Sequence, residues 1–198
     1  MNLQAALAVF DNMTHNEHFT EPSSPPPPEE HASARKPDWL FLRQHPAHMI
    51  AIGFGSGLSP KAPGTAGTLF AWAIFALLYP WLNDLAWGIL LLLSLPVGVW
   101  ACQRTASALQ VQDPGSIVWD EIIAFWLVLW LIMPTTFWGQ CAAFALFRLF
   151  DALKPGPVRW ADKAFKGWGY KGAIGIILDD LVAAFLTLLI FAIWRFFF

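Results

Sequence analysis

The sequence predicts an all-α membrane protein, an integral bundle of about five apolar helices that follows an unpacked N-terminal tail. The chain has 198 residues, of which 57% are apolar and only 13% are charged. A soluble domain usually carries about a quarter charged residues, so this deficit favours a membrane protein. Two further observations support the prediction: apolar runs of helical length recur along the chain, and the cations gather on one side of them.

The first 37 residues differ in composition from the rest and form the predicted tail. Residues 21–30 are rich in Pro and Glu and include four consecutive prolines, Pro25 to Pro28. Such a stretch favours an extended chain without a packed core. Residues 1–10 lack the basic start and the long apolar segment of a signal peptide. We therefore expect a disordered tail over residues 1–37 and a membrane-embedded domain over residues 38–198.

The predicted domain begins with an interfacial segment, residues 38–52, whose aromatic and cationic side chains suit a membrane surface. Five apolar runs then follow. A straight span needs about 20 residues, and the third and fourth runs are shorter, so they are either tilted spans or one re-entrant hairpin broken near Pro134. Pro96 is expected to kink the second run. The runs cover residues 66–82, 85–101, 121–133, 137–150 and 173–194.

The distribution of cations favours five spans with the N-terminus in the cytoplasm. Threading the chain through the membrane in this way leaves Arg195 as the one Lys or Arg on the outer side. The two outer loops, residues 83–84 and 134–136, contain neither Lys nor Arg, which is the positive-inside pattern. The same threading brings five acidic residues to the cytoplasmic side, namely Asp120, Glu121, Asp151, Asp179 and Asp180.

Two of these acids, Asp179 and Asp180, lie inside an apolar run. Carboxylates in a membrane segment are costly and usually face a protein interior or a watery cavity, so they indicate a functional site. A second pair, Asp120 and Glu121, opens another run. Adjacent helical residues point about 100° apart, so at most one of that pair reaches a metal directly. The alternative is helix capping plus one interhelical hydrogen bond.

A loop rich in Gly and Pro, residues 53–68, leads into the first run, where a helix is expected to begin near Thr65. Free N–H groups at the start of that helix, with Lys61 and Thr65 nearby, would suit a phosphate group. The loop matches neither the Rossmann pattern nor the P-loop. Taken alone, the loop is better explained by a tight turn with an N-cap.

A third motif places Lys154 and Arg159 on a loop stiffened by prolines, close to Asp151. Lys and Arg are the cations that bind phosphate groups, although pairing with carboxylates for structure is an even alternative. Carboxylates together with such cations at a membrane surface suggest Mg²⁺ and a phosphorylated lipid, because Mg²⁺ prefers oxygen ligands and neutralises phosphoryl oxygens. The number of ions, and the choice between water and a carboxylate as nucleophile, stay open.

Other chemistries lack the residues that they need. The net charge of −2 and the absence of a basic cluster argue against nucleic acid. Cys102 and Cys141 are too few for a disulfide framework and are expected to be free. Every histidine precedes the first apolar run, which argues against a Ser-His-Asp hydrolase. The implied partners are a phospholipid substrate and the lipid bilayer, and no protein partner is implied.

In this order and spacing, the motifs resemble the phosphatidylglycerophosphatase A family over residues 45–194. The resemblance rests on GFGSGLSPKAPGTAGTL, GSIVWDE, FRLFDALKP with PVRW, and GIILDDLVA. It implies an all-α, Mg²⁺-dependent phosphatase that converts phosphatidylglycerophosphate to phosphatidylglycerol at the bacterial inner membrane. The implied catalytic and metal-binding residues are Asp120, Glu121, Asp179 and Asp180. Candidates for substrate binding are Asp151, Lys154 and Arg159 from this resemblance, and Lys61 and Thr65 from the glycine-rich loop.

Some positions depart from the family pattern. Ala124 and Ala184 stand where Gly is expected, Ile177 replaces a usual Met, and the lead-in over residues 168–175 is longer than usual. The last change could alter how the Asp pair is presented. Two other functions therefore stay open: a phosphatase for another lipid phosphate, and a small transporter that uses Asp179 and Asp180. The expected location is the bacterial inner membrane, multi-pass, with the N-terminus and the active site cytoplasmic.

Overall fold

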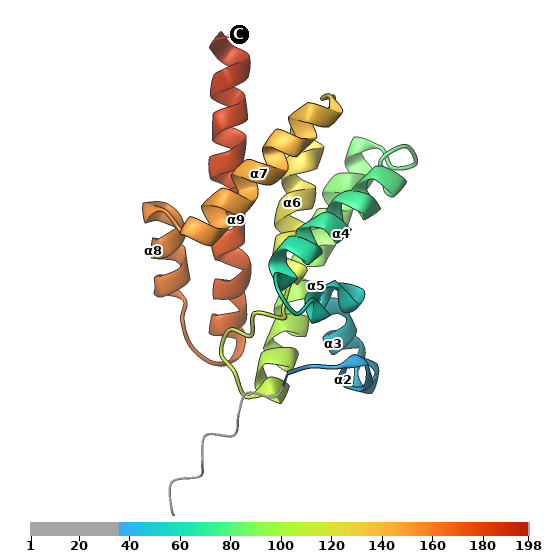
Figure 1. Cartoon of the computed structure of the whole chain (residues 1–198), viewed down its shortest axis with the longest axis vertical. Helices are drawn as coiled ribbons and strands as arrows, with labels where there is room; N and C mark the ends of the chain where they lie inside the picture. The colour runs from blue at the N-terminus through green and yellow to red at the C-terminus, as the bar shows by residue number, and fades with distance from the viewer. Residues whose placement is uncertain (1–35, 198) are drawn as a thin grey trace, which may run out of the picture. The chain divides into compact units, whose positions relative to one another are not determined.

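The computed structural model describes residues 36–197, and the predicted tail, residues 1–37, lies outside this range except for its last two residues. All regular structure in the described range is helical, which confirms the all-α prediction for this part of the chain (Figure 1). The elements are α2 (Trp39–Gln44), α3 (Pro46–Ala51), the 3₁₀ helix η1 (Gly53–Leu58), α4 (Pro63–Leu78), α5 (Asp84–Leu109), α6 (Trp119–Ile132), α7 (Phe137–Leu153), α8 (Gly156–Ala164) and α9 (Gly169–Phe197).

The predicted interfacial segment forms two short helices that attach to the end of α5. The Asp38 carboxylate accepts a hydrogen bond from the N–H of Phe41 at 2.8 Å and so begins α2. The His45 ring nitrogen accepts one from the N–H of Ala47 at 3.1 Å and begins α3. Buried His48 shares a hydrogen bond of 3.0 Å with the Thr105 hydroxyl, which fixes α3 against α5.

The five predicted apolar runs all appear as helices, but two of them are long and apolar enough to cross a membrane. These are α5, with 26 residues, and α9, with 29 residues. α4 has 16 residues and α6 has 14. At 1.5 Å per residue, α6 extends about 21 Å, short of the roughly 30 Å of a hydrocarbon core. The structure therefore supports two candidate spans rather than five. Pro96 lies inside α5, which continues past it.

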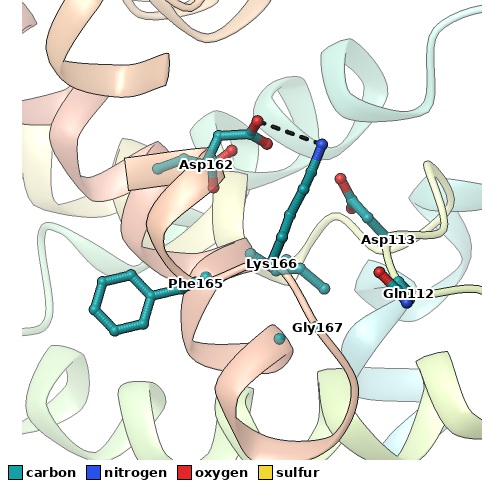
Figure 2. Close-up of a pocket in the computed structure, with 10 residues that line it drawn as sticks. Gln112, Asp113, Asp162, Phe165, Lys166 and Gly167 are labelled. Carbon is teal, nitrogen blue, oxygen red and sulfur yellow. Dashed lines mark ion pairs between the residues drawn. The ribbon is translucent and has the colours of Figure 1, made fainter. Parts of the chain in front are cut away.

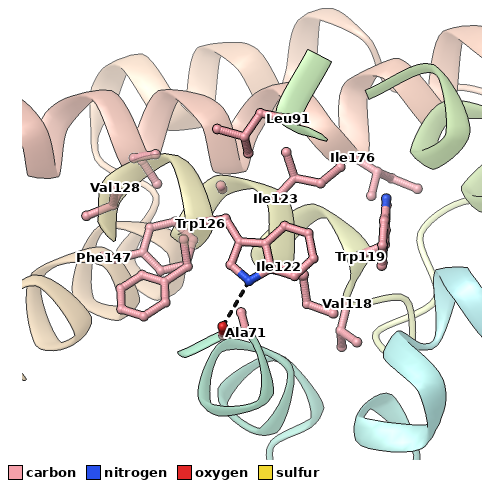
Figure 3. Close-up of a cluster of buried hydrophobic side chains, with 14 of the residues drawn as sticks. Ala71, Leu91, Val118, Trp119, Ile122, Ile123, Trp126, Val128, Phe147 and Ile176 are labelled. Atoms are coloured by element: carbon pink, nitrogen blue, oxygen red, sulfur yellow. Dashed lines mark hydrogen bonds between the residues drawn. The ribbon is translucent and has the colours of Figure 1, made fainter. Parts of the chain in front are cut away.

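Helix α6 occupies the centre of the bundle and is buried on nearly every side. It packs against α4, α5, α7 and α9, and Figure 3 shows its aliphatic and indole side chains meeting those of its neighbours. The indole N–H of Trp126 donates to the carbonyl of Ala71 on α4 at 2.9 Å (Figure 3). That of Trp119 donates to the carbonyl of Ser94 on α5 at 3.3 Å. These bonds satisfy polar groups that would otherwise be costly in an apolar core.

The outer faces of α5 and α9 carry large apolar side chains. Leu92 and Leu93 on α5 are 68% and 59% exposed, and Phe185 on α9 is 63% exposed. Exposed apolar surface on this scale is unusual in a soluble protein. It fits two helices whose outer faces contact lipid.

Close approach between α4 and the start of α6 depends on glycine. A Cβ at Gly67 would lie 2.6 Å from the Cβ of Val118, whereas a Cβ at Gly88 in α5 would first meet Trp130 at 3.6 Å. We expect Gly67→Ala to destabilise the fold by about 1–3 kcal/mol through overpacking. Gly88→Ala should be neutral or stabilising by up to about 1 kcal/mol, because Ala favours the helix. Thermal unfolding of both variants in one detergent measures the difference, and equal midpoints would contradict this packing.

Candidate functional site

Acidic residues from two packed helices, α6 and α9, meet in the bundle. Asp120 and Glu121 lie in the first turn of α6, and Asp179 and Asp180 lie in the first half of α9. One carboxylate oxygen from each of Asp120, Glu121 and Asp180 lies within 4.8 Å of the other two. We call these three residues the carboxylate cluster. Its members come from segments about 60 positions apart in the sequence, so the packing of α6 on α9 creates it.

Each member of the carboxylate cluster has a buried oxygen without a hydrogen-bond partner among the described residues. These atoms are Oδ1 of Asp120, Oε2 of Glu121 and Oδ2 of Asp180. Asp120 and Glu121 are partly exposed as whole residues, but these particular oxygens are closed off from solvent. Buried carboxylates without a counter-charge cost several kcal/mol each. A group of three carboxylates with ligand oxygens within 4.8 Å of one another could hold a divalent cation, and an all-oxygen set suits Mg²⁺.

The carboxylate cluster opens into a cavity of about 150 Å³. Besides the cluster, its wall holds one cation, Lys154, and three acids, Asp113, Asp151 and Asp179. The remaining lining comes from Gly115, Ile117 and Ile176. Ile176, Asp179 and Asp180 share one face of α9, because residues three and four apart in a helix lie on the same side. The cavity is therefore a small acidic chamber with one lysine.

Arg148 of α7 neutralises part of this acidic charge and connects three helices. Its Nη1 lies 2.5 Å from Oδ2 of Asp151, one turn along α7, and 3.7 Å from Oε1 of Glu121. The same nitrogen donates to the hydroxyl of Thr68 on α4 at 3.5 Å. That hydroxyl in turn donates to the carbonyl of Gly64 at 2.8 Å. The Arg148 guanidinium thus helps to fix the position of the Glu121 carboxylate.

The glycine-rich loop approaches the site at Gly64, in the first turn of α4. A Cβ there would lie 2.2 Å from Oε1 of Glu121 and 3.0 Å from Nη2 of Arg148. Earlier in the loop, a Cβ at Gly57 would lie 2.1 Å from the carbonyl oxygen of Ser116. Two glycines of this motif therefore allow the loop to pack closely against the segment that carries Asp120 and Glu121.

Lys154 joins α7, α8 and α9 through its ammonium group. The residue caps α7 in the left-handed region, with φ of 44°. Its Nζ donates to Oδ1 of Asp162 on α8 at 2.9 Å and directly to Oδ2 of Asp179. Burial alone would lower the pKa of Lys154, but the hydrogen bonds and charges of Asp179 and Asp162 outweigh it and raise that pKa above its usual range. The ammonium therefore stays protonated in the cavity wall.

A second, smaller hollow of about 40 Å³ adjoins the cavity and shares Asp113, Ile176 and Asp179 with it. Figure 2 shows Gln112 and Asp113 on one side of this hollow and Asp162 on the other. The ammonium of Lys166 lies 3.6 Å from Asp162 (Figure 2). Asp179 thus lines both the 150 Å³ cavity and the smaller hollow.

The structure brings most of the predicted site residues together. Asp120, Glu121, Asp151, Lys154, Asp179 and Asp180 all line the 150 Å³ cavity. Lys61, Thr65 and Arg159 do not line it. Lys61 and Arg159 are exposed, and Thr65 is half-buried in the first turn of α4. Thr65 lies outside the cavity because the glycine that precedes it packs against the start of α6. Arg159 lies outside it because its side chain is on the exposed side of α8.

Two charged residues at the site, Arg148 and Asp162, were absent from the residues predicted to form it. The spacing of Arg148 and Asp151, three apart in a helix, could have suggested their ion pair. Asp162 could be found only by recognising α8, whose Val158 and Ala161 are buried and place the next residue beside Lys154.

The Lys154–Asp162 pair predicts a pH-dependent stability. Burial raises the pKa of Asp162, but the hydrogen bond and charge of Lys154 and the charge of Lys166 outweigh it and lower that pKa below its usual value. A depressed carboxyl pKa contributes stability above the unfolded value of about 3.9, and this contribution is lost as the pH falls through the folded value. We expect Asp162→Asn to lower the thermal midpoint at pH 6 and to differ less from the parent near pH 3. Solvent limits the effect to below about 1 kcal/mol.

Asp84→Asn is a suitable control, because within the described residues no cation lies within 4 Å of Asp84, whose Oδ1 accepts a hydrogen bond from the indole N–H of Trp130 at 3.2 Å. Thermal midpoints measured between pH 3 and pH 7 test the prediction. A difference between parent and Asp162→Asn that is constant over this range would contradict it.

Comparison with known proteins matches the sequence to one family. The family described as Phosphatidylglycerophosphatase A matches residues 49–195. A relative with that name from Escherichia coli (strain K12) is 42% identical over 147 residues, 72% of this chain and 80% of the relative. One from Haemophilus influenzae is 39% identical over 75% of this chain and 89% of the relative. A Bacteroides thetaiotaomicron protein named "Putative phosphatidylinositol-3-phosphatase" is 39% identical over 74% of this chain and 92% of its own length.

No solved structure matches the chain. The family match spans the apolar helices α4 to α9 and every residue of the carboxylate cluster, and the identity of about 40% extends over most of both chains. The chain therefore belongs to the phosphatidylglycerophosphatase A family and is an enzyme of the phosphatase class.

Proposed function

We propose that the chain hydrolyses phosphatidylglycerophosphate to phosphatidylglycerol and inorganic phosphate, with Mg²⁺, at the cytoplasmic face of the bacterial inner membrane. The observation that carries the proposal is the carboxylate cluster, with its three unpaired buried oxygens, in a cavity that also contains the ammonium of Lys154. Two relatives named phosphatidylglycerophosphatase A, at about 40% identity, support the choice of substrate and a role in phosphatidylglycerol synthesis.

The carboxylate cluster is the set of residues that would hold Mg²⁺. When bound there, the ion would supply positive charge for the phosphoryl oxygens. Without a cation the cavity carries an excess of carboxylates over its single lysine, and a phosphate dianion would be repelled. A cation held by Asp120, Glu121 and Asp180 would offset this repulsion.

The other cavity residues then have separate tasks. The Lys154 ammonium is placed to bind a phosphoryl oxygen, as a point charge whose three donors are only partly used by Asp162 and Asp179. Asp179 keeps Lys154 in position and accepts a hydrogen bond from the N–H of Asp180 at 3.1 Å. Hydrolysis breaks the ester P–O bond, joins the water oxygen to phosphorus, and leaves a proton on the released alcohol. Lys61, Thr65 and Arg159 stay predictions for contacts with the rest of the headgroup.

The membrane placement is supported by helix length and by charge. α5 and α9 are the candidate spans, and we propose that α4, α6 and α7 complete a multi-pass domain around the buried α6. Arg195 lies in the last turn of α9, at the opposite end from Asp179 and Asp180. The other cations precede Asp179 in the sequence and fall on the proposed cytoplasmic side. In this placement the acyl chains of the substrate stay in the inner leaflet while its phosphate reaches the cavity.

A second lipid phosphate is supported by one relative. The Bacteroides thetaiotaomicron protein, whose name refers to a phosphatidylinositol phosphate, is as similar to this chain as the Haemophilus influenzae phosphatidylglycerophosphatase A. The catalytic cavity alone does not discriminate between headgroups, because its lining contacts the phosphate end of any substrate. The substrate test therefore needs both lipids.

The decisive experiment measures phosphate release by purified protein in detergent. Phosphatidylglycerophosphate, phosphatidate and phosphatidylinositol 3-phosphate are each offered with Mg²⁺ or with EDTA. We expect Mg²⁺-dependent release from phosphatidylglycerophosphate. Asp180→Asn, which removes a cluster ligand, should lower the rate at least about 100-fold. Asp84→Asn, far from the cavity, should keep full activity. Release that persists in EDTA, or no release by folded protein, would refute the proposal.

The contact of Arg148 with Glu121 predicts a specific change in metal binding. Arg148→Lys keeps the charge but loses the planar fork that reaches Asp151, Glu121 and Thr68 together. Because groups that orient metal ligands typically contribute about 10–100-fold to metal affinity, we expect the Mg²⁺ concentration for half-maximal thermal stabilisation to rise by about tenfold. Arg104→Lys, on the exposed end of α5, is the matched control. An unchanged Mg²⁺ titration of Arg148→Lys would show that this arginine does not orient Glu121.

A further inference from the structure

Helix α8 presents a basic and aromatic face to the outside of the bundle. Its residues Val158 and Ala161 are buried, and α8 packs mainly on α9, on the outer side of the molecule (Figure 1). Arg159, Trp160 and Lys163 are exposed, with Trp160 at 65%. Arg159 and Lys163 are four residues apart and therefore adjacent on the helix surface. We call these three residues the outer face of α8.

The outer face of α8 has no counter-charge of its own. Within residues 36–197, no carboxylate lies within 4 Å of Arg159 or Lys163, whereas Lys154 and Lys166 both pair with Asp162. The chain that follows α8 continues the same character, with Trp168 52% exposed, Tyr170 61% exposed and Lys171 exposed. Tryptophan next to unpaired cations is the combination found at membrane interfaces.

The inner side of the same helix reaches the catalytic cavity. Asp162 accepts a hydrogen bond from Lys154, and Lys154 donates to Asp179 in the cavity wall. Figure 2 shows Asp162 among the residues that line the adjoining hollow. A nine-residue helix thus carries an unpaired cationic surface on one side and a bond to the cavity lysine on the other.

We propose that the outer face of α8 docks on the anionic headgroups of the bilayer, and that this contact holds Asp162, Lys154 and Asp179 in their active arrangement. Charge complementarity identifies the occupant, since each Lys or Arg near an anionic lipid surface contributes about 1 kcal/mol. Trp160 favours a bilayer over a soluble anion, because its large apolar ring gains nothing from a free phosphate. The effect on activity rests on the proposed function, whereas the docking itself does not.

The docking is tested by fluorescence, with no measurement of enzyme activity. Ala164→Cys, an exposed position at the end of α8, carries an environment-sensitive fluorophore in a Cys141→Ser background, and buried Cys102 is left in place. The labelled protein is placed in nanodiscs of neutral phosphatidylcholine or of phosphatidylcholine with roughly 30% phosphatidylserine. We expect a blue shift of the emission in the anionic discs, reversed by about 0.5 M salt because salt screens surface charge.

Matched variants separate docking from a general charge effect. Trp160→Ser with Lys163→Gln should abolish the blue shift, and Arg195→Gln, at the other end of α9, should keep it. Equal emission of the parent label in the two kinds of disc would overturn the proposal. So would the same shift in neutral discs on addition of inorganic phosphate, because a soluble anion would then be the occupant.

The coupling to the cavity is tested by hydrolysis of phosphatidylglycerophosphate at one fixed mole fraction in both discs. We expect anionic lipid to raise kcat/KM by about fivefold, the equivalent of about 1 kcal/mol. The Trp160→Ser, Lys163→Gln variant should lose this increase and keep the parent rate in neutral discs. A blue shift with no change in rate would overturn the coupling. A blue shift with no hydrolysis in either disc would support docking and refute the proposed function instead.

Discussion

The structure depends on how three carboxylates are held in an apolar bundle. Asp120, Glu121 and Asp180 each place an unpaired oxygen in a space closed off from solvent, where an uncompensated charge is expensive. Local cations cover part of this charge: Arg148 pairs with Asp151 and, at 3.7 Å, with Glu121, and Lys154 pairs with Asp179. The remaining charge is what a divalent cation would balance. A cation bound there would therefore stabilise the fold, because the free energy of metal binding adds to that of folding.

Residues from five helices hold the side chains of this site in position. α4 contributes the gap at Gly64, α6 and α9 contribute the carboxylate cluster, and α7 contributes Arg148. Helix α8 adds Asp162, which fixes the lysine of the cavity. Since α6 is buried between the other long helices, its first turn cannot move without disturbing all of them. Preorganisation of this kind keeps catalytic groups in place at little cost during the reaction.

Much of this arrangement could be predicted from the sequence. The five apolar runs correctly predicted the positions of the long helices. The acidic pairs predicted that Asp120, Glu121, Asp179 and Asp180 lie together, because charged residues in apolar runs indicate a functional site. Of the five predicted spans, two helices reach the length of a membrane span, because hydropathy alone does not show where a helix ends: α4 has 16 residues and α6 has 14. Arg148 and Asp162 were missed for another reason: their partners lie on different helices, and a single sequence does not reveal which helix faces meet.

The glycines of the loop and α4 have a consequence for how the family signature is read. Gly57, Gly64 and Gly67 each face an atom of residues 116–121 at a distance that leaves no room for a methyl group. Gly64 and Gly67 lie one turn apart, so together they set the longitudinal position of α4 along the segment that carries Asp120 and Glu121. A shift of α4 by one residue would push Thr65 or Thr68 into that contact. A glycine-rich loop that was predicted to bind phosphate can therefore fix the alignment of two helices by steric contact, and its persistence among relatives would report that alignment as much as ligand contact.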